Sequence, residues 1–323
     1  MSTSFQTPAI ELAGLRKTYP RGAGQPPKEA LRGIDLSIPR GAFFGLLGPN
    51  GAGKSTLIGI LAGLVRKTAG TARVWGVDLD ADPIGLRRRI GVVPQELNLD
   101  PFFTPRETME MQAALFGITR ARRRTMQILD AVGLADKADA YARSLSGGMR
   151  RRLLVAKAMV HDPPVLVLDE PTAGVDIELR EQLWRMVQGL NAAGTTIVLT
   201  THYLEEAESL CDRIAIIGQG RLIADQPTRE LIARIDDKAL SITLDREITV
   251  VPPALARFDA VLEGSRRLTL RYRAGDTRVE TILESVREAG FGILDLSTQE
   301  PDLNAIFLRL TREQVQEKAP APA

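Results

Sequence analysis

The chain has 323 residues, of which 44% are hydrophobic and 25% charged, so it is long enough for about two domains and can bury a sizeable core. Its 42 basic and 40 acidic residues give a formal net charge of +2, which argues against a nucleic-acid-binding protein. The single cysteine, Cys211, excludes an intrachain disulfide and fits a reducing compartment, and we interpret it as a small buried apolar residue. The N-terminus does not predict a secretory signal, and no run of about 20 apolar residues predicts a membrane span, so work at a membrane would require another chain.

The N-terminal part of the chain predicts several short strands and one early helix. A turn-rich segment joins two alternating strands, and the next apolar run, at 41–48, is bounded by glycine. Apolar residues then recur at helical spacing after Gly53. We therefore expect strands within 10–38 and at 41–48, 72–79 and 88–95, and a helix at 54–65.

The middle of the chain predicts a helical insert followed by strands that are covered on both faces. Residues 104–159 have a helical pattern broken by turns. The runs at 164–171 and 195–202 are rich in leucine and β-branched residues with little polar alternation, which is typical of a parallel sheet. A crossover helix is expected at 177–194 and a hairpin at 212–225. This order predicts an α/β domain built on a parallel sheet.

The character of the sequence changes after about residue 235. Half-exposed strands at 239–245 and 266–273, a further strand at 292–297 and helices at 279–290 and 302–315 predict a small α+β domain. We therefore expect a first domain at 1–235 with a helical subdomain at about 100–160, an accessory domain at 236–313 and a disordered tail at 314–323.

The segment GPNGAGKST at 48–56 carries the pattern of a phosphate-binding P-loop, with Gly48, Gly53, Lys54 and Ser55 in place. It follows a predicted strand and begins a predicted helix, which is the context that such a loop requires. Glycine lets the backbone fold closely around phosphates, and the helix N-terminus adds a partial positive charge. We expect Lys54 to reach the β- and γ-phosphates of a nucleotide and Ser55 to bind Mg²⁺.

Polar side chains also follow three other predicted strands. Asp169 and Glu170 end one strand, where Asp169 could hold Mg²⁺ and Glu170 could polarise an attacking water. Such a pair alone is more often a solvated turn, but the P-loop in the same sheet favours the catalytic interpretation. His202 closes the next strand at the same edge, where a contact with a γ-phosphate competes with a purely structural role. Gln95 follows a third strand and could bind Mg²⁺ weakly or orient water, and chemistry alone does not decide between these. We interpret His161 as structural.

A second glycine turn, LSGG at 145–148, raises the question of why a chain with one P-loop carries another anion-binding turn. Arginine runs at 87–89, 122–124 and 150–152 are interpreted as solvated helix faces, with contacts to acidic lipid or an acidic partner loop as the alternative.

Together these motifs resemble the ATPase subunit of ABC transporters over about residues 10–228. The resemblance implies an α/β fold of the P-loop NTPase class with a parallel sheet core, an antiparallel β subdomain and a helical subdomain, followed here by the small C-terminal α+β domain. It implies ATP and Mg²⁺ as cofactors and ATP hydrolysis as the reaction. The ATP-binding residues that it implies are Tyr19, which would stack on adenine, and Gly48, Pro49, Asn50, Gly51, Ala52, Gly53, Lys54, Ser55 and Thr56.

The same resemblance assigns roles at the reacting end of the nucleotide. Glu170 is implied as the general base, Gln95 as the Q-loop glutamine, His202 as the switch histidine and Asp176 as the D-loop aspartate. The implied Mg²⁺ ligands are Ser55, Gln95 and Asp169. In this family two subunits pack head to tail, so the signature residues Leu145, Ser146, Gly147 and Gly148 would complete the ATP site of the other subunit. This arrangement answers the question raised by the second glycine turn.

The sequence is similar in particular to the YadG type of bacterial ATP-binding subunits, which are grouped with drug-resistance and polysaccharide exporters. This resemblance implies a homodimer that docks on a separate integral membrane permease with about six spans, through a surface that includes Glu96 to Phe103. The protein would then be peripheral on the cytoplasmic face of the cell membrane, and cytoplasmic when isolated. The alternative is a soluble ABC ATPase that acts outside transport.

Overall fold

The computed structural model describes residues 7–22, 24–174, 176–233, 237–273, 276–299 and 303. The chain divides into two units, Met1–Pro227 and Thr228–Ala323. The predicted domain boundary at 235, the predicted tail at 314–323 and, apart from Leu303, the helix predicted at 302–315 lie outside the described residues. The predicted domain limits therefore stay predictions.

A six-stranded sheet in the order β10-β9-β3-β8-β7-β6 forms the centre of the first unit. All neighbouring strands are parallel except β9 and β10, which form the predicted hairpin. Every residue of β3 and β8 is buried, which explains their continuous apolar runs. The strands are β3 (Phe43–Leu47), β6 (Ile90–Val93), β7 (Val165–Asp169), β8 (Thr196–Thr200), β9 (Arg213–Gly218) and β10 (Arg221–Pro227).

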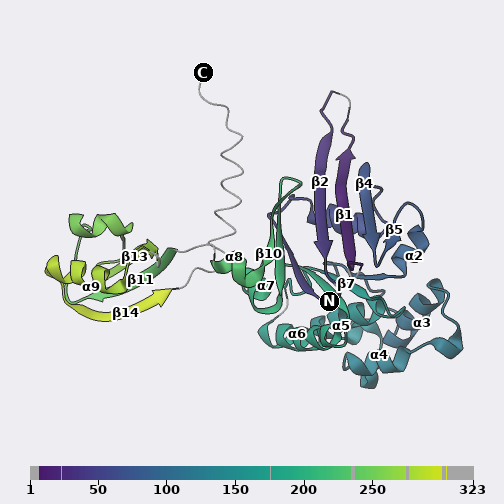
Figure 1. The fold of residues 1–323 in the computed structure, drawn as a ribbon. Helices are drawn as coiled ribbons and strands as arrows, with labels where there is room; N and C mark the ends of the chain where they lie inside the picture. Colours follow the sequence, from purple (N-terminus) through teal and green to yellow (C-terminus); the bar gives the residue numbers. More distant parts are fainter. Residues whose placement is uncertain are drawn as a thin grey trace, which may run out of the picture. The chain divides into compact units, whose positions relative to one another are not determined.

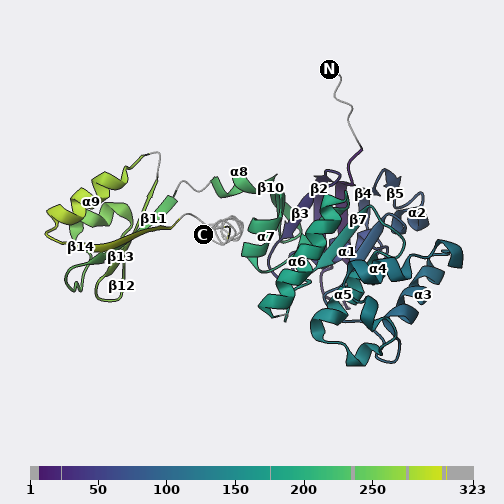
Figure 2. The ribbon, with the colours of Figure 1, turned by 90° about the horizontal axis from the view of Figure 1, so that it is seen from below.

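Helices pack on this sheet and connect its strands (Figure 2). Helix α1 (Lys54–Leu61) begins directly after the P-loop. Helix α5 (Gly147–Ala158) packs against β6, and the crossover helix α6 (Ile177–Ala192) packs against β8. The first unit also contains two short helices that the sequence pattern did not predict, α2 (Pro83–Arg87) and α7 (Leu204–Leu210).

An antiparallel sheet in the order β2-β1-β4-β5 forms a second layer, with β1 and β2 as a long hairpin (Figure 1). Its apolar side chains share one core with α1 and with the parallel sheet. The single strand predicted at 72–79 is wrong, because Trp75 and Gly76 both have a positive φ and form a turn between two strands. The strands are β1 (Ile10–Tyr19), β2 (Lys28–Ile38), β4 (Ala69–Val74) and β5 (Val77–Asp78).

The helical insert has its own core beside the sheets. It consists of α3 (Pro105–Leu115), α4 (Thr125–Ala131) and α5, joined by short 3₁₀ turns. Thr104 begins α3 with a capping box in which Thr104 and Glu107 satisfy each other's backbone N–H groups. Met109, Leu129 and Leu153 are fully buried where the three helices meet.

The second unit is a four-stranded antiparallel sheet in the order β12-β13-β11-β14 with helix α9 packed on it. The elements are α8 (Thr228–Ala233), β11 (Asp237–Leu244), β12 (Val261–Glu263), β13 (Arg267–Arg273), α9 (Val279–Glu288) and β14 (Ile293–Gln299). In the part of the chain that the structure describes, no helix is both long and apolar enough to span a membrane.

Candidate active site

The P-loop follows β3 and wraps around the start of α1 because two of its glycines occupy positions that a side chain could not. A Cβ atom on Gly48 would collide with the carbonyl oxygen of Ile217 in β9. Gly53 has φ of 115°, and a Cβ there would lie 2.7 Å from the carbonyl oxygen of Ala30. The sequence pattern therefore has a local steric cause, and the loop is held against β2 and β9.

Lys54 lies inside the loop rather than in solvent. Its side chain is buried, and Nζ donates to the carbonyl oxygens of Gly48 at 2.6 Å and Pro49 at 3.4 Å. Burial lowers the pKa of Lys54, while Glu170 and Asp169 oppose that shift. The loop thus holds an ammonium group that anionic phosphates can neutralise at close range.

The carboxyl ends of neighbouring parallel strands bring the other predicted residues together. Asp169 ends β7 and its Oδ1 accepts a 2.6 Å hydrogen bond from the hydroxyl of Thr200, the last residue of β8. The backbone N–H of Glu170 donates to the carbonyl oxygen of Thr200 at 3.0 Å. Glu170 has φ of 45°, a left-handed conformation that a residue with a side chain adopts only when its surroundings impose it.

Glu170 is the centre of a three-residue cluster. Its Oε2 accepts from Nε2 of Gln95 at 2.9 Å and lies 3.3 Å from Nδ1 of His202. Gln95 follows β6 and His202 follows β8, so both flank Glu170 from strands on the same sheet edge. The arrangement can polarise a water molecule beside a phosphate, since one carboxylate is held between a donor amide and an imidazole.

A cleft of about 440 Å³ lies above the P-loop, and its lining gathers most of the predicted ATP-binding residues with Gln95 and Glu170. The lining residues are Tyr19, Lys28, Ala30, Asn50, Gly51, Ala52, Gly53, Lys54, Ser55, Thr56, Gln95 and Glu170. Gly48, Pro49, Asp169 and His202 lie next to this set without lining the cleft. The cleft is thus lined by the aromatic ring of Tyr19, the P-loop and the carboxylate of Glu170, which are the groups that a nucleotide site requires.

The glycine turn at 145–148 is the N-terminus of α5. Ser146 is the N-cap, and its Oγ accepts from the backbone N–H of Met149 at 3.2 Å. Gly148 packs against Leu179 of α6, whose own N-cap is Asp176. None of the described residues Leu145 to Gly148 lines the cleft above the P-loop of the same chain.

The model of the ABC transporter family matches residues 31–173. Over 317 residues the chain is 38% identical to the daunorubicin/doxorubicin resistance ATP-binding protein DrrA of Streptomyces peucetius, with 94% of this chain and 93% of DrrA covered. The chain belongs to the ABC transporter family. The Nod factor export ATP-binding protein I of Ralstonia nicotianae (strain ATCC BAA-1114 / GMI1000) is also 38% identical, with 96% of both chains covered.

Solved structures support the same conclusion for the fold. The chain is similar to a dimeric ATP-binding cassette in a post-hydrolysis state bound to ADP and Pi, with a TM-score of 0.60, 29% identity and coverage of 68% of this chain and 99% of that one. It is also similar to cbiO1 from Clostridium perfringens, part of the ABC transporter complex cbiONQ, with a TM-score of 0.63, 27% identity and coverage of 70% and 91%. The predicted ABC ATPase fold is confirmed, and the chain is an ATP-binding ATPase of this family.

The interpretation of the arginine run at 150–152 as a solvated helix face is wrong for Arg151 in the ABC ATPase. Arg151 is only 4% exposed, and its Nη1 donates to the carbonyl oxygens of Pro94 at 3.0 Å and Gln95 at 2.9 Å. Helical periodicity contained the signal, because Arg151 falls on one stripe with the buried residues Gly148, Val155 and Ala158.

Sequence reasoning also missed Glu206, a buried acid that contacts the residue before His202. Its Oε2 accepts from the hydroxyls of Thr172 at 3.0 Å and Thr201 at 2.8 Å, and its Oε1 lies 3.4 Å from Nε of Arg180. Glu206 thereby ties the segment after Glu170 to the residue that precedes His202. The sequence held no local signal for this role, since Glu206 is one of several acids in a short polar helix.

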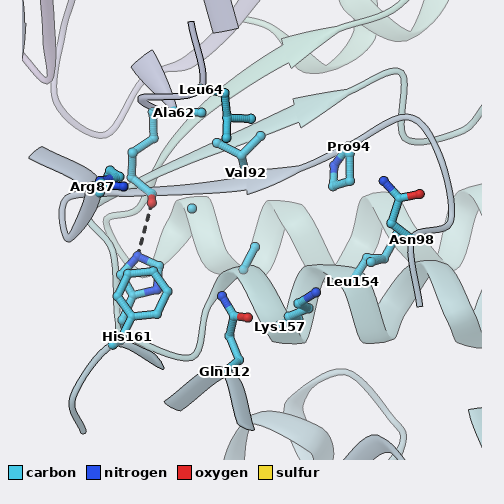
Figure 3. A pocket seen from close by; sticks show the side chains of 14 residues that line it. Ala62, Leu64, Arg87, Val92, Pro94, Asn98, Gln112, Leu154, Lys157 and His161 are labelled. Carbon is cyan, nitrogen blue, oxygen red and sulfur yellow. Dashed lines mark hydrogen bonds between the residues drawn. The ribbon is translucent and has the colours of Figure 1, made fainter. Parts of the chain in front are cut away.

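A second cleft, of about 220 Å³, lies between β6, α5 and the end of α3. Figure 3 shows it between the strand with Val92, the residue Pro94 just after that strand, and the helix with Leu154, with His161 at one end. The ring of His161 stacks on Phe116 at a centroid distance of 3.8 Å, and its Nε2 lies 3.1 Å from the carbonyl oxygen of Ile90. Burial lowers the pKa of His161, which favours the neutral ring.

Proposed function

We propose that the chain is the ATP-hydrolysing subunit of an exporter and that Glu170 is its general base. The observation that carries this proposal is the cluster in which Gln95 and His202 flank Glu170 beside the buried Lys54. Relatives that align over more than nine-tenths of their own length are named for drug resistance or for export, including the linearmycin resistance ATP-binding protein LnrL of Bacillus subtilis (strain 168). An ABC ATPase that acts outside transport is therefore the less favoured function.

In this proposal the residues of the cluster and the P-loop divide the tasks around the phosphates. Lys54 binds the β- and γ-phosphates, and His202 contacts the γ-phosphate. Glu170 accepts the proton of an attacking water, and Gln95 orients that water. Tyr19, which lines the cleft together with the P-loop residues, stacks on the adenine ring.

The oxygen donors in the site fit Mg²⁺. Asp169 and Ser55 supply one carboxylate and one hydroxyl, and no cluster of three acidic, histidine or cysteine side chains suited to a metal ion occurs among the described residues. Mg²⁺ is typically held by one or two carboxylates together with nucleotide phosphates and water, so this small set suffices, with Gln95 as a further oxygen donor. When bound, the ion would neutralise charge on the phosphates.

The cleft above the P-loop supports a head-to-tail homodimer. Its own chain supplies the P-loop and Glu170 but none of the signature residues, so the N-terminus of α5 is left to bind the ATP held by a second copy. The similar solved cassette that binds ADP and Pi is itself dimeric, which supports the same assembly for this chain. ATP would then join the subunits, and hydrolysis would release them.

The permease would dock on the second cleft and on the segment from Glu96 to Phe103 beside it. Leu97, Phe102 and Phe103 are exposed apolar residues on that segment, and Pro94 and Asn98 line the cleft itself (Figure 3). Such a surface fits a short helix from a cytoplasmic loop of a separate permease with about six spans. Docking there would hold the ATPase at the cytoplasmic face of the membrane.

The Glu170→Gln variant tests the central assignment. The change keeps the shape of the side chain and removes its basicity, so steady-state hydrolysis should fall about 100-fold or more. ATP should still bind, and light scattering should detect a dimer that persists with ATP. Wild-type turnover in this variant would refute the role of Glu170.

A further inference from the structure

Arg151 carries its charge at a buried position, where an unpaired charge would destabilise the fold. It is 4% exposed, and burial alone lowers its pKa, with no carboxylate among the described residues opposing the shift. Its partners are instead two successive backbone carbonyl oxygens, those of Pro94 and Gln95. An apolar side chain could fill this space but could not bind those oxygens, so the contact itself accounts for a buried guanidinium.

The two carbonyls belong to the segment that leaves the end of β6. Strand β6 ends at Val93, so the β-ladder no longer fixes the backbone that carries Gln95. In place of the ladder, Nη1 of Arg151 donates to the carbonyl oxygens of both peptide groups and so holds them. The side chain of Gln95 is then aimed at Glu170, to which it donates at 2.9 Å.

The other end of this contact is the helix that begins at the signature turn. Arg151 lies just over one turn after Ser146, the N-cap of α5. Further along, α5 is packed directly on β6, because Gly91 leaves room for the carbonyl oxygen of Ala158 where a Cβ could not fit. Helix α5 therefore contacts β6 near its C-terminal end and the backbone of Gln95 near its N-terminal end.

We propose that Arg151 is a positioning residue that sets the place of Gln95 relative to the signature helix. This inference rests on the proposed function, in which Gln95 serves the ATP of its own chain and Ser146 serves the ATP of the partner. Arg151 acts on turnover through Gln95, since Arg151 itself does not line the cleft above the P-loop. A displacement of the signature turn is carried along α5 to Gln95 in the same subunit.

Arg152 provides a matched control on the same helix. Its Nη1 also donates to two successive carbonyl oxygens, those of Val132 at 2.9 Å and Gly133 at 3.2 Å. Those residues belong to the helical insert and not to the Gln95 segment. Arg151→Met and Arg152→Met therefore remove the same kind of contact from α5, and only the first frees Gln95.

The test is a double-mutant cycle on ATP hydrolysis. Arg151→Met should lower kcat about tenfold and change KM for ATP less than about threefold, since the P-loop is untouched. In a Gln95→Ala background, Arg151→Met should lower kcat less than about twofold further, because its effect passes through Gln95. Arg152→Met should change kcat less than about twofold in either background. If Gln95→Ala itself falls to the detection floor, Gln95→Asn is the background.

Each outcome decides the proposal. It is overturned if Arg151→Met multiplies the loss caused by Gln95→Ala, or if Arg152→Met equals Arg151→Met in the wild-type background. If Arg151→Met does not fold, Arg151→Lys is used in the same cycle, and its smaller loss of about threefold must likewise vanish when Gln95 is absent. Absence of ATP hydrolysis in the wild-type protein would refute the proposed function and the inference with it, whereas additive losses in an active enzyme refute only the role of Arg151.

Discussion

Removing the carboxylate of Glu206 should destabilise the first unit substantially. Glu206→Ala deletes two hydrogen bonds to a charged acceptor, from the hydroxyls of Thr172 and Thr201, and each contributes about 1.5 kcal/mol. The ion pair with Arg180 adds less than about 1 kcal/mol, because the arginine side chain is 26% exposed. We therefore expect the free energy of unfolding to fall by about 3 kcal/mol.

Tryptophan fluorescence during urea titration measures this quantity in the intact chain. The two tryptophans of the sequence, Trp75 and Trp184, both lie in the unit that contains Glu206, so their emission follows that unit alone. Glu205→Ala is the matched control, because Glu205 is an exposed neighbour on the same helix and its loss should cost under about 0.5 kcal/mol. Equal destabilisation by the two variants would refute the reasoning about the buried hydroxyl contacts.

Two further outcomes follow from the same structure. Burial lowers the pKa of His161 below its ordinary 6.5, so the folded chain binds fewer protons than the unfolded chain and stability is lost as the pH falls through that ordinary value. Wild type should therefore lose more free energy of unfolding between about pH 7.5 and about pH 5.5 than His161→Phe does, and parallel urea-derived curves would contradict this. A chain that ends at residue 233 should still bind ATP in equilibrium dialysis, because the whole cleft lies before residue 228, and a folded truncated chain that does not bind would count against it.

The parts of the site that were predictable are those with a local cause. The P-loop pattern reflects backbone geometry at Gly48 and Gly53, which is the same in any chain that makes this turn. Asp169, Glu170 and His202 could be placed because each ends or closely follows a strongly apolar strand, and parallel strands bring their carboxyl ends to one edge. Their chemical roles remain predictions.

The residues that were missed depend on partners far away in the sequence. Arg151 is buried because the backbone of Pro94 and Gln95 needs donors, and those residues are more than 50 positions away. The contact of Glu206 with Thr172 likewise joins segments 34 positions apart, which follow the paired strands β7 and β8. The turn at Trp75 and Gly76 was missed because two residues with positive φ interrupt an otherwise continuous apolar alternation.

The central claim, that each ATP site is shared between two chains, is tested most directly by mixing two inactive variants. Lys54→Ala should disable a site through its P-loop, and Ser146→Arg should disable it through the signature turn by blocking the phosphates. Each variant alone then forms dimers with two defective sites. A mixed dimer has both defects in one site and keeps Lys54 and Ser146 intact in the other.

The measurement is ATP hydrolysis and trapped nucleotide after the two variants, carrying different tags, have exchanged chains. Random exchange should restore about a quarter of the wild-type sites, since half of the dimers are mixed and each keeps one intact site. Counting trapped nucleotide covers the case in which coupling between the sites silences turnover. If tagged chains exchange and neither hydrolysis nor trapped nucleotide recovers, Lys54 and Ser146 do not serve one ATP from two chains, and the shared site is contradicted.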